Sequence, residues 1–349
     1  ELILKSKNTL DLNKDFVCDY ENHHKIAQKV AEGSMVLLKN DENLLPLKKG
    51  QKVAVIGEMA KLPRFQGAGS SVINPTKLCN AFDELVAIGV DADYAQDYYK
   101  SSPAKKDKKR KSDEVLLSEA IELAKSHDVA IVFVGLTEEI EGEGYDKLSI
   151  KMPQNHDILV TEIAKVNPNT IVVLAGGSVV SMPWIENVKS ILNSGLGGQA
   201  GGAAVANILT GNVNPSGKIA ETYPLDLSDT PTYGNFPGGP VVAEHKESVY
   251  VGYRYYDTAE KDVLFPFGHG LSYTKFEYSE LKIRKSNPNG GDDDDDDDDD
   301  LSNVKDTDVL DVSFKIKNIG GFDGSEIAQI YVTDKESTIF RPIKELRAF

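Results

Sequence analysis

The chain contains little cysteine, tryptophan or histidine. Its 349 residues include two cysteines, one tryptophan and six histidines. Cys18 and Cys79 lie far apart, so they form no disulfide framework, and neither has the spacing of a metal site. Two thiols in a chain of this length slightly favour a reducing, cytoplasmic compartment. The location itself stays open, because residue 1 is Glu and the natural start of the protein is not visible.

Long apolar runs and excess positive charge are also absent. No run approaches the roughly 20 apolar residues that a membrane-spanning helix needs, so we expect no membrane partner. The net charge is -16, and the run of aspartates at 292–300 supplies nine of these charges, which leaves -7. An acidic chain of this kind is not expected to bind nucleic acid. The basic cluster at 105–111 lacks interleaved aromatic residues and predicts a surface loop.

What the sequence does contain is an alternation of strand and helix patterns. The strand-like runs are short, mostly apolar and rich in β-branched residues, which is typical of strands covered on both faces. They occupy 52–57, 129–135, 170–176 and 190–193. Helical patterns lie at 114–126, 154–166 and 198–209, and residues 20–40 predict a helix running into a turn. This order predicts an α/β domain with a mostly parallel sheet sandwiched between helices.

The composition changes after residue 228. Residues 229–275 are rich in glycine, proline and tyrosine without a clear helical pattern, which predicts an irregular connector. Alternating patterns at 276–285, 309–318 and 327–333 predict the beginning of an all-β sandwich over residues 276–349. The low-complexity run at 292–300 interrupts this segment, and too few strands follow to close two sheets. We therefore expect an incomplete β-sandwich after the α/β domain.

A crowded group of carboxylates follows the apolar run at 129–135. Four glutamates and one aspartate lie within residues 138–146. In an open α/β sheet, ligands bind beyond the carboxyl ends of the strands. Because neighbouring carboxylates repel, we expect the pKa of at least one of them to be raised, as a general acid requires. A solvated acidic loop is the alternative that composition leaves open.

Six stretches of the chain, in order, carry a family resemblance. They lie at 24–47, at 52–57 with 66–71, and at 141–153, 201–218, 250–273 and 341–347. Together they resemble glycoside hydrolase family 3, the β-glucosidase family, over nearly all of the chain. The resemblance implies that residues 21–228 form the family's α/β sandwich domain. It also implies that residues 1–20 are the last helix of a preceding (β/α)8 barrel with a linker, and that residues 276–349 are part of a fibronectin type III-like domain.

The resemblance implies an activity as well. It is that of a retaining β-glycosidase, specifically a β-glucosidase that removes terminal non-reducing β-D-glucosyl residues from a β-glucoside or short oligosaccharide, without a cofactor or metal. The sequence EGYDK at 143–147 is similar to the family's loop for the general acid/base, which assigns that role to Glu143, with Glu141 as the second candidate. The aspartate nucleophile and most sugar-binding groups are expected in the barrel, outside this chain. The barrel is then a partner within the same full-length protein.

Other parts of the reading stay open. The resemblance suggests Arg64, Phe65, Ser70 and Tyr145 as sugar contacts, while QGAGSS at 66–71 also fits a purely structural turn. A non-catalytic carbohydrate-binding protein and a nucleotide-binding α/β domain are the alternative functions. The nucleotide-binding alternative lacks a Gly-x-Gly-x-x-Gly sequence directly after its first strand-like run. Sugar specificity and homo-oligomerisation are not decided.

Overall fold

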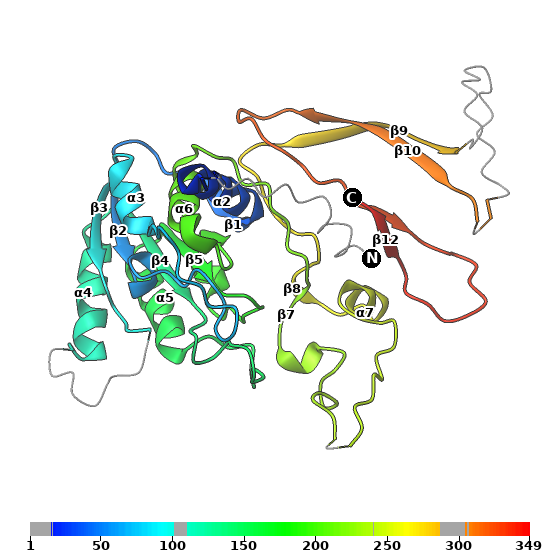
Figure 1. The fold of residues 1–349 in the computed structure, drawn as a ribbon, viewed down its shortest axis with the longest axis horizontal. Helices are drawn as coiled ribbons and strands as arrows, with labels where there is room; N and C mark the ends of the chain where they lie inside the picture. The colour runs from blue at the N-terminus through cyan, green and yellow to red at the C-terminus, as the bar shows by residue number, and fades with distance from the viewer. Residues whose placement is uncertain (1–14, 16, 101–109, 240, 287–303, 306) are drawn as a thin grey trace.

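The computed structural model describes residues 15, 17–100, 110–239, 241–286, 304–305 and 307–349. The expected barrel helix at 1–9 and the aspartate run at 292–300 lie outside these residues. Figure 1 shows an α/β part followed by a connector and by paired strands at the carboxyl end of the chain. The α/β part carries the carboxylate-rich loop, so it is described first.

A six-stranded sheet forms the centre of the α/β part. Its strand order is β1-β6-β5-β4-β2-β3, and every neighbouring pair is parallel except β1 with β6. The bounds are β1 Val36–Asn40, β2 Lys52–Ile56, β3 Asp91–Ala95, β4 Val129–Gly135, β5 Thr170–Ala175 and β6 Ser190–Asn193. All seven residues of β4 are buried, as the continuous apolar run predicted. The four strands expected from the sequence are confirmed.

Helices cover both faces of this sheet (Figure 1). Helix α6 packs against both α2 and α3 in one layer, and α4 packs against α5 in the other. Their bounds are α2 Tyr20–Ser34, α3 Ala81–Ala87, α4 Asp113–Lys125, α5 Gln154–Val166 and α6 Gly201–Thr210. Polar side chains cap the amino ends of three of them. Asp19 Oδ1 accepts from the amide of Asn22, Asn80 Oδ1 from that of Asp83, and Ser112 Oγ from that of Val115. The predicted fold class, a mostly parallel sheet between helices, is confirmed.

Three elements around the six-stranded sheet differ from the sequence-based expectation. The helix expected over residues 20–40 ends at Ser34, and the chain continues as β1 instead of a turn. This strand forms because tertiary partners take up its backbone groups: it pairs with β6, while Leu271 donates its amide to Leu37 O and His269 contacts Leu38 O. The sequence also gave no sign of β3 and α3. Strand β3 reads DADYA and lies at the sheet edge, so it lacks the apolar pattern of a buried strand.

The connector is more ordered than its composition predicted. Helix α7, Tyr253–Thr258, lies within it, so the expectation of no helix there is wrong. Strands β7, Tyr223–Pro224, and β8, Val263–Phe265, pair in an antiparallel manner. Before the connector and at its beginning, short 3-10 turns occur at Asp41–Asn43, Glu58–Ala60, Ile185–Asn187, Gly198–Ala200 and Leu227–Asp229. Helix α7 begins with the residues YRYY, and the ring of the first of these, Tyr253, packs against Phe267 and Tyr331.

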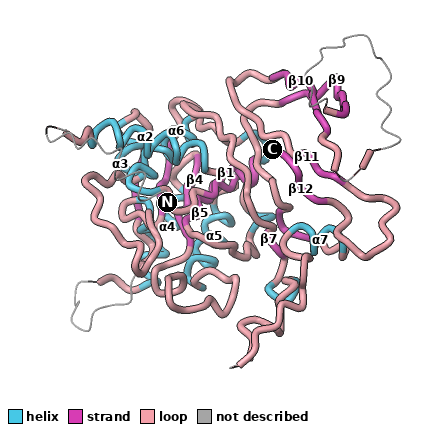
Figure 2. The backbone as a smooth tube through the Cα atoms, turned by 45° about the vertical axis from the view of Figure 1, so that its right-hand side comes forward, coloured by secondary structure: helices cyan, strands magenta, loops and turns pink. Residues whose placement is uncertain are grey.

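The carboxyl-terminal segment consists of two antiparallel strand pairs. Strand β9, Phe276–Lys285, pairs with β10, Leu310–Asn318, and β11, Ile330–Val332, pairs with β12, Glu345–Ala348. Figure 2 shows these strands apart from the six-stranded sheet, with loop segments between them. Side chains from β9, β10 and β11 line a shared groove. Strands β9, β10 and β11 agree with the alternating patterns that predicted β-structure in this segment, whereas β12 lies outside those patterns.

Candidate active site

The carboxylate-rich loop begins where β4 ends, at the edge of the sheet where the other parallel strands also end. Its base is rigid, because the backbone N–H and C=O of Gly135 both contact Nδ1 of His156, at 3.3 and 2.9 Å. His156 is 1% exposed and packs on the ring of Tyr98. Burial lowers the pKa of His156 to about 4, so the ring is neutral near pH 7. A fixed strand end therefore supports the loop.

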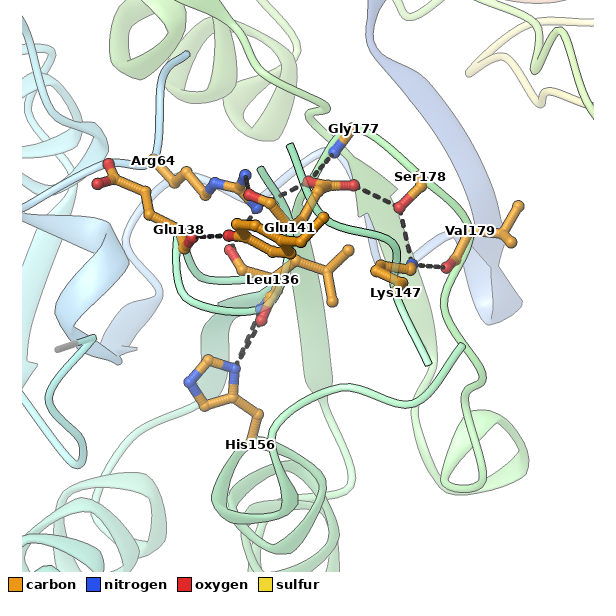
Figure 3. Close-up of polar contacts among 11 residues, drawn as sticks. Arg64, Leu136, Glu138, Glu141, Lys147, His156, Gly177, Ser178 and Val179 are labelled. Carbon is orange, nitrogen blue, oxygen red and sulfur yellow. Dashed lines mark hydrogen bonds and ion pairs between the residues drawn. The ribbon is translucent and has the colours of Figure 1, made fainter. Parts of the chain in front are cut away.

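Glu141 anchors the loop from inside. Its Oε2 accepts hydrogen bonds from Arg64 Nη1 at 2.8 Å and from the amide of Gly177 at 2.9 Å, and its Oε1 accepts from Ser178 Oγ. Arg64 is only 4% exposed and also donates to Leu136 O and to Glu141 O, both at 2.9 Å. Figure 3 shows these groups converging on the Glu141 carboxylate. Both oxygens of Glu141 are thus occupied by groups of the chain itself.

Lys147 closes the other end of the loop (Figure 3). Its Nζ donates to Ser178 Oγ at 2.7 Å and to Val179 O at 3.0 Å. Burial lowers the pKa of Lys147, and the charge of Glu141 opposes that shift. Residues 141 and 147 are therefore both tied to the turn that follows β5. Neither Lys147 nor this turn was assigned a separate role from the sequence.

Glu143 lies between these two anchors and is exposed. Its Oε2 accepts hydrogen bonds from the amide of Ser70, at 2.7 Å, and from Ser70 Oγ. Its own amide donates to Ala68 O at 3.1 Å. The structure thus brings together Glu143 and Ser70, two of the residues that the sequence singled out. They come from separate loops at the same edge of the sheet.

The expectation of a raised carboxyl pKa is wrong for both candidate residues. Burial would raise the pKa of Glu141, but the hydrogen bonds from Ser178 and Gly177 and the charges of Arg64 and Lys147 hold it below its ordinary value. The hydrogen bonds from Ser70 lower the pKa of Glu143. The hydrogen bonds lower these pKa values more than repulsion between the carboxylates of the loop raises them, since the two side chains point to different donors. In this structure both groups favour the carboxylate form.

The other expected sugar contacts lie near the same loop. Phe65 is half-buried, and its carbonyl accepts from the amide of Gly198 at 2.9 Å. Tyr145 is 48% exposed and donates its hydroxyl to Glu138 O. The two outer nitrogens of Arg64 bind within the chain, which assigns this side chain a part in holding the loop. Contacts of these residues with a sugar stay predictions.

Two further properties concern binding partners. Among the described residues, no group of three or more His, Cys, Asp or Glu side chains is arranged to hold a metal ion. Within the same part of the chain, no helix has both the length and the apolar character needed to cross a membrane.

Comparison with known proteins identifies the family. The model of the glycosyl hydrolase family 3 C-terminal domain matches residues 35–273, which include β1 to β8 and both loops of the candidate site. The chain belongs to glycosyl hydrolase family 3.

Known family 3 proteins resemble this chain over almost its whole length. It is 46% identical to thermostable beta-glucosidase B of Acetivibrio thermocellus over 95% of this chain and 41% of that protein. It is 38% identical to an exo-alpha-(1->6)-L-arabinopyranosidase of Bifidobacterium longum over 100% of this chain and 44% of that protein. The crystal structure of a Bifidobacterium adolescentis GH3 beta-glucosidase matches with a TM-score of 0.87 and 38% identity, covering 99% of this chain and 47% of that one. The family 3 chain therefore spans less than half the length of these relatives.

Proposed function

We propose that this chain supplies the general acid/base of a retaining β-glucosidase, with Glu143 as the catalytic carboxyl group. The observation that carries the proposal is the contrast between the two candidate carboxylates. Glu141 is bound on both oxygens by Arg64, Gly177 and Ser178, whereas Glu143 is exposed and bound on Oε2. A group that donates a proton to a substrate must be within reach of it. That requirement favours Glu143 over Glu141.

The chemistry would proceed in two steps. In the first, an aspartate of the barrel bonds to the anomeric carbon, the glycosidic bond breaks, and the carboxyl proton of Glu143 moves to the leaving oxygen. In the second, the Glu143 carboxylate takes a proton from water, whose oxygen bonds to the anomeric carbon as the aspartate leaves. Retaining enzymes hold the two carboxyl groups about 5–5.5 Å apart. A loop at the sheet edge, tied down at both ends, can hold one of them across a domain boundary.

The relatives support a glycoside substrate and leave the sugar open. One relative is named a beta-glucosidase and another an exo-alpha-(1->6)-L-arabinopyranosidase, at comparable coverage of this chain. We propose terminal non-reducing β-D-glucosyl residues as the substrate, with the preceding barrel choosing among sugars. The proposed division of the chain is linker to residue 20, α/β domain 21–228, connector 229–275 and fibronectin type III-like segment 276–349.

The nucleotide-binding alternative lacks its main structural requirement. A dinucleotide-binding strand leads at once into a helix whose amino terminus holds the phosphates. Here β2 ends at Ile56 and is followed by the three-residue turn Glu58–Ala60, and the next α-helix begins only at Ala81. Within the described part of the chain, no α-helix begins directly after β2, where the phosphates of a dinucleotide would lie.

The test is Glu143→Gln in the full-length protein that carries this chain. Glutamine cannot donate the proton, so hydrolysis of glucosides with poor leaving groups should fall by roughly 10²–10⁴-fold. Activated aryl glucosides should lose much less in the first step, and the glycosyl-enzyme should accumulate. Azide needs no deprotonation, so it should restore turnover and give a β-glycosyl azide, measured by product analysis.

Glu141→Gln is the matched control, because it lies two residues away on the same loop. It should reduce stability through the loss of the Arg64 pairing, and azide should not rescue it. Azide rescue of Glu141→Gln but not of Glu143→Gln would move the role to Glu141. Unchanged hydrolysis in both variants would place the general acid/base elsewhere. Sugar binding without hydrolysis by the unaltered full-length protein would favour the non-catalytic carbohydrate-binding alternative.

A further inference from the structure

Ser70 holds the Glu143 carboxyl group through a single oxygen. The amide and the hydroxyl of Ser70 both donate to Oε2 of Glu143. Among the described residues, none donates a hydrogen bond to Oε1. The two oxygens of the proposed acid/base therefore differ in kind: one faces the protein and the other is left for a substrate.

The loop that presents Ser70 is itself fixed. The side-chain amide of Gln66 donates to Ile73 O at 3.1 Å and accepts from the amide of Ile73 at 3.0 Å, which closes residues 66–73 into a compact loop. Gly69 makes the approach to Glu143 close, because a Cβ at position 69 would lie 2.6 Å from Glu143 Cβ and 2.9 Å from Oε2. Gly69 also has a φ of +105°, a backbone conformation that residues with a side chain rarely adopt. Only glycine at this position lets the two loops meet.

We propose that Ser70 is a positioning residue that makes Oε2 of Glu143 a permanent hydrogen-bond acceptor, so that Oε1 is the oxygen that carries and delivers the catalytic proton. The inference rests on the proposed function of Glu143. Its physical basis is that a backbone amide can donate but never accept. The amide of Ser70 therefore keeps Oε2 as an acceptor in the carboxylate and in the carboxylic acid alike. The acid proton then has one site left, on Oε1, to which no described residue donates a hydrogen bond.

The charged groups around Glu143 do not provide an alternative cause for the lowered pKa of its carboxyl group. On its own loop these are Glu138, Glu139, Glu141, Asp146 and Lys147, and on the facing segment, residues 57–80, they are Glu58, Lys61, Arg64 and Lys77. Arg64 and Lys147 act on the carboxylate of Glu141. The pKa of Glu143 is lowered by the hydrogen bonds from the hydroxyl and the amide of Ser70, with burial as a small opposing effect.

The proposal predicts the direction in which the pH profile of kcat/KM shifts when the Ser70 hydroxyl is removed. Hydrogen bonds to a carboxylate stabilise the charged form and lower the pKa, so removing the Ser70 hydroxyl raises the pKa of Glu143. The acid then stays protonated to higher pH. In the intact enzyme the alkaline limb of kcat/KM, which reports the general acid, therefore moves to higher pH.

The experiment compares Ser70→Ala, Ser70→Thr and Ser71→Ala in the full-length protein, with an alkyl or other poorly activated β-glucoside as substrate. Ser70→Ala should move the alkaline limb to higher pH and reduce kcat/KM on the order of 10-fold, because the carboxyl group loses one of its two fixing contacts. Ser70→Thr keeps a hydroxyl and should restore the limb. Ser71→Ala changes the exposed neighbouring serine and should leave the profile as it was.

Each other result has a distinct meaning. An unmoved alkaline limb in Ser70→Ala, with or without a higher KM, overturns the inference and makes Ser70 a sugar contact or a structural residue. A limb that moves to lower pH overturns it as well. Failure of the azide rescue in Glu143→Gln would instead remove the proposed function itself, so the two failures can be told apart.

Discussion

Glu141 and Glu143 are two residues apart and have opposite environments. The Glu141 side chain is 17% exposed and pairs with Arg64, whose side chain is 1% exposed. Breaking a pair of this kind by removing one partner leaves a poorly solvated charge, which costs more than an exposed ion pair contributes. Glu143 is held instead by a serine hydroxyl and an amide at the rim. Identical side chains can thus serve as an anchor and as a reactive group, because their partners differ.

His156 gives a residue-scale prediction about stability and pH. Its pKa is about 4 in the folded chain and 6.5 ordinarily, so the unfolded chain binds a proton first as pH falls. The stabilisation is fully present above pH 6.5 and is lost as pH falls toward 4. At 1.36 kcal/mol per unit this amounts to about 3 kcal/mol of unfolding free energy.

The measurement is denaturant unfolding of the chain from pH 7 to pH 4, compared with His156→Asn. Asparagine can keep a nitrogen near the backbone of Gly135 but does not titrate. The difference in unfolding free energy between the two proteins should shrink as pH falls, since other titrating groups contribute equally to both. A constant difference across this range would mean that His156 is protonated in the folded chain as well.

At the scale of elements, α6 must approach α3 very closely. A Cβ at Gly202 would lie 2.5 Å from the backbone carbon of Asn80 and 2.7 Å from Cys79 O, whereas a Cβ at Gly201 meets nothing within 4 Å. Backbone atoms cannot move aside as a flexible side chain can. The two adjacent glycines therefore differ: Gly202 is needed for the close packing, whereas a side chain at Gly201 would fit.

We expect Gly202→Ala to destabilise the chain by about 1–3 kcal/mol, because the added methyl group overpacks the contact between α6 and residues 79–80. Gly201→Ala is the matched control and should be neutral or stabilising by up to about 1 kcal/mol through helix propensity. Thermal and denaturant unfolding of both variants would measure this. Equal effects of the two substitutions would show that α6 can shift to make room.

In the proposed function, the two reactive groups belong to different domains of the full-length protein. The loop after β4 would provide one carboxyl group, and a barrel outside this chain would provide the nucleophile. Retaining hydrolysis needs both, at about 5–5.5 Å. The activity is therefore expected to depend on how the α/β domain sits against that barrel.

The corresponding prediction is that the 349-residue chain alone does not hydrolyse aryl β-glucosides. Purified chain should show no turnover above that of its Glu143→Ala version, because the proposed nucleophile belongs to the barrel and not to these residues. The full-length protein, assayed in parallel, is the positive control. Turnover by the chain alone that disappears with Glu143→Ala would place the nucleophile within these residues and contradict the proposed division of labour.

Local patterns were enough for much of the sheet and its helices. Strands β4 and β6 and helix α5 begin and end where the apolar patterns predicted, because a strand buried on both faces must be apolar throughout. Strand β1 could not be predicted in this way, since its pairing partner β6 and its cover at residues 269–271 are far away in sequence. The same holds for β3, whose polar residues suit its edge position.

The sequence by itself determined the fold class, the family and the loop that carries the candidate carboxylates. Composition, local patterns and the ordered series of motifs suffice for these three properties, because each property depends on which residues occur in which order. Only the tertiary structure decided that Glu141 pairs with Arg64 and that Glu143 rests on Ser70. These partners lie about 70 positions upstream and meet the loop because the parallel strands β2 and β4 end at the same edge of the sheet. The contacts with these partners lower the pKa of both carboxyl groups. The crowding visible in the sequence predicted a raised pKa instead, because it does not show these partners.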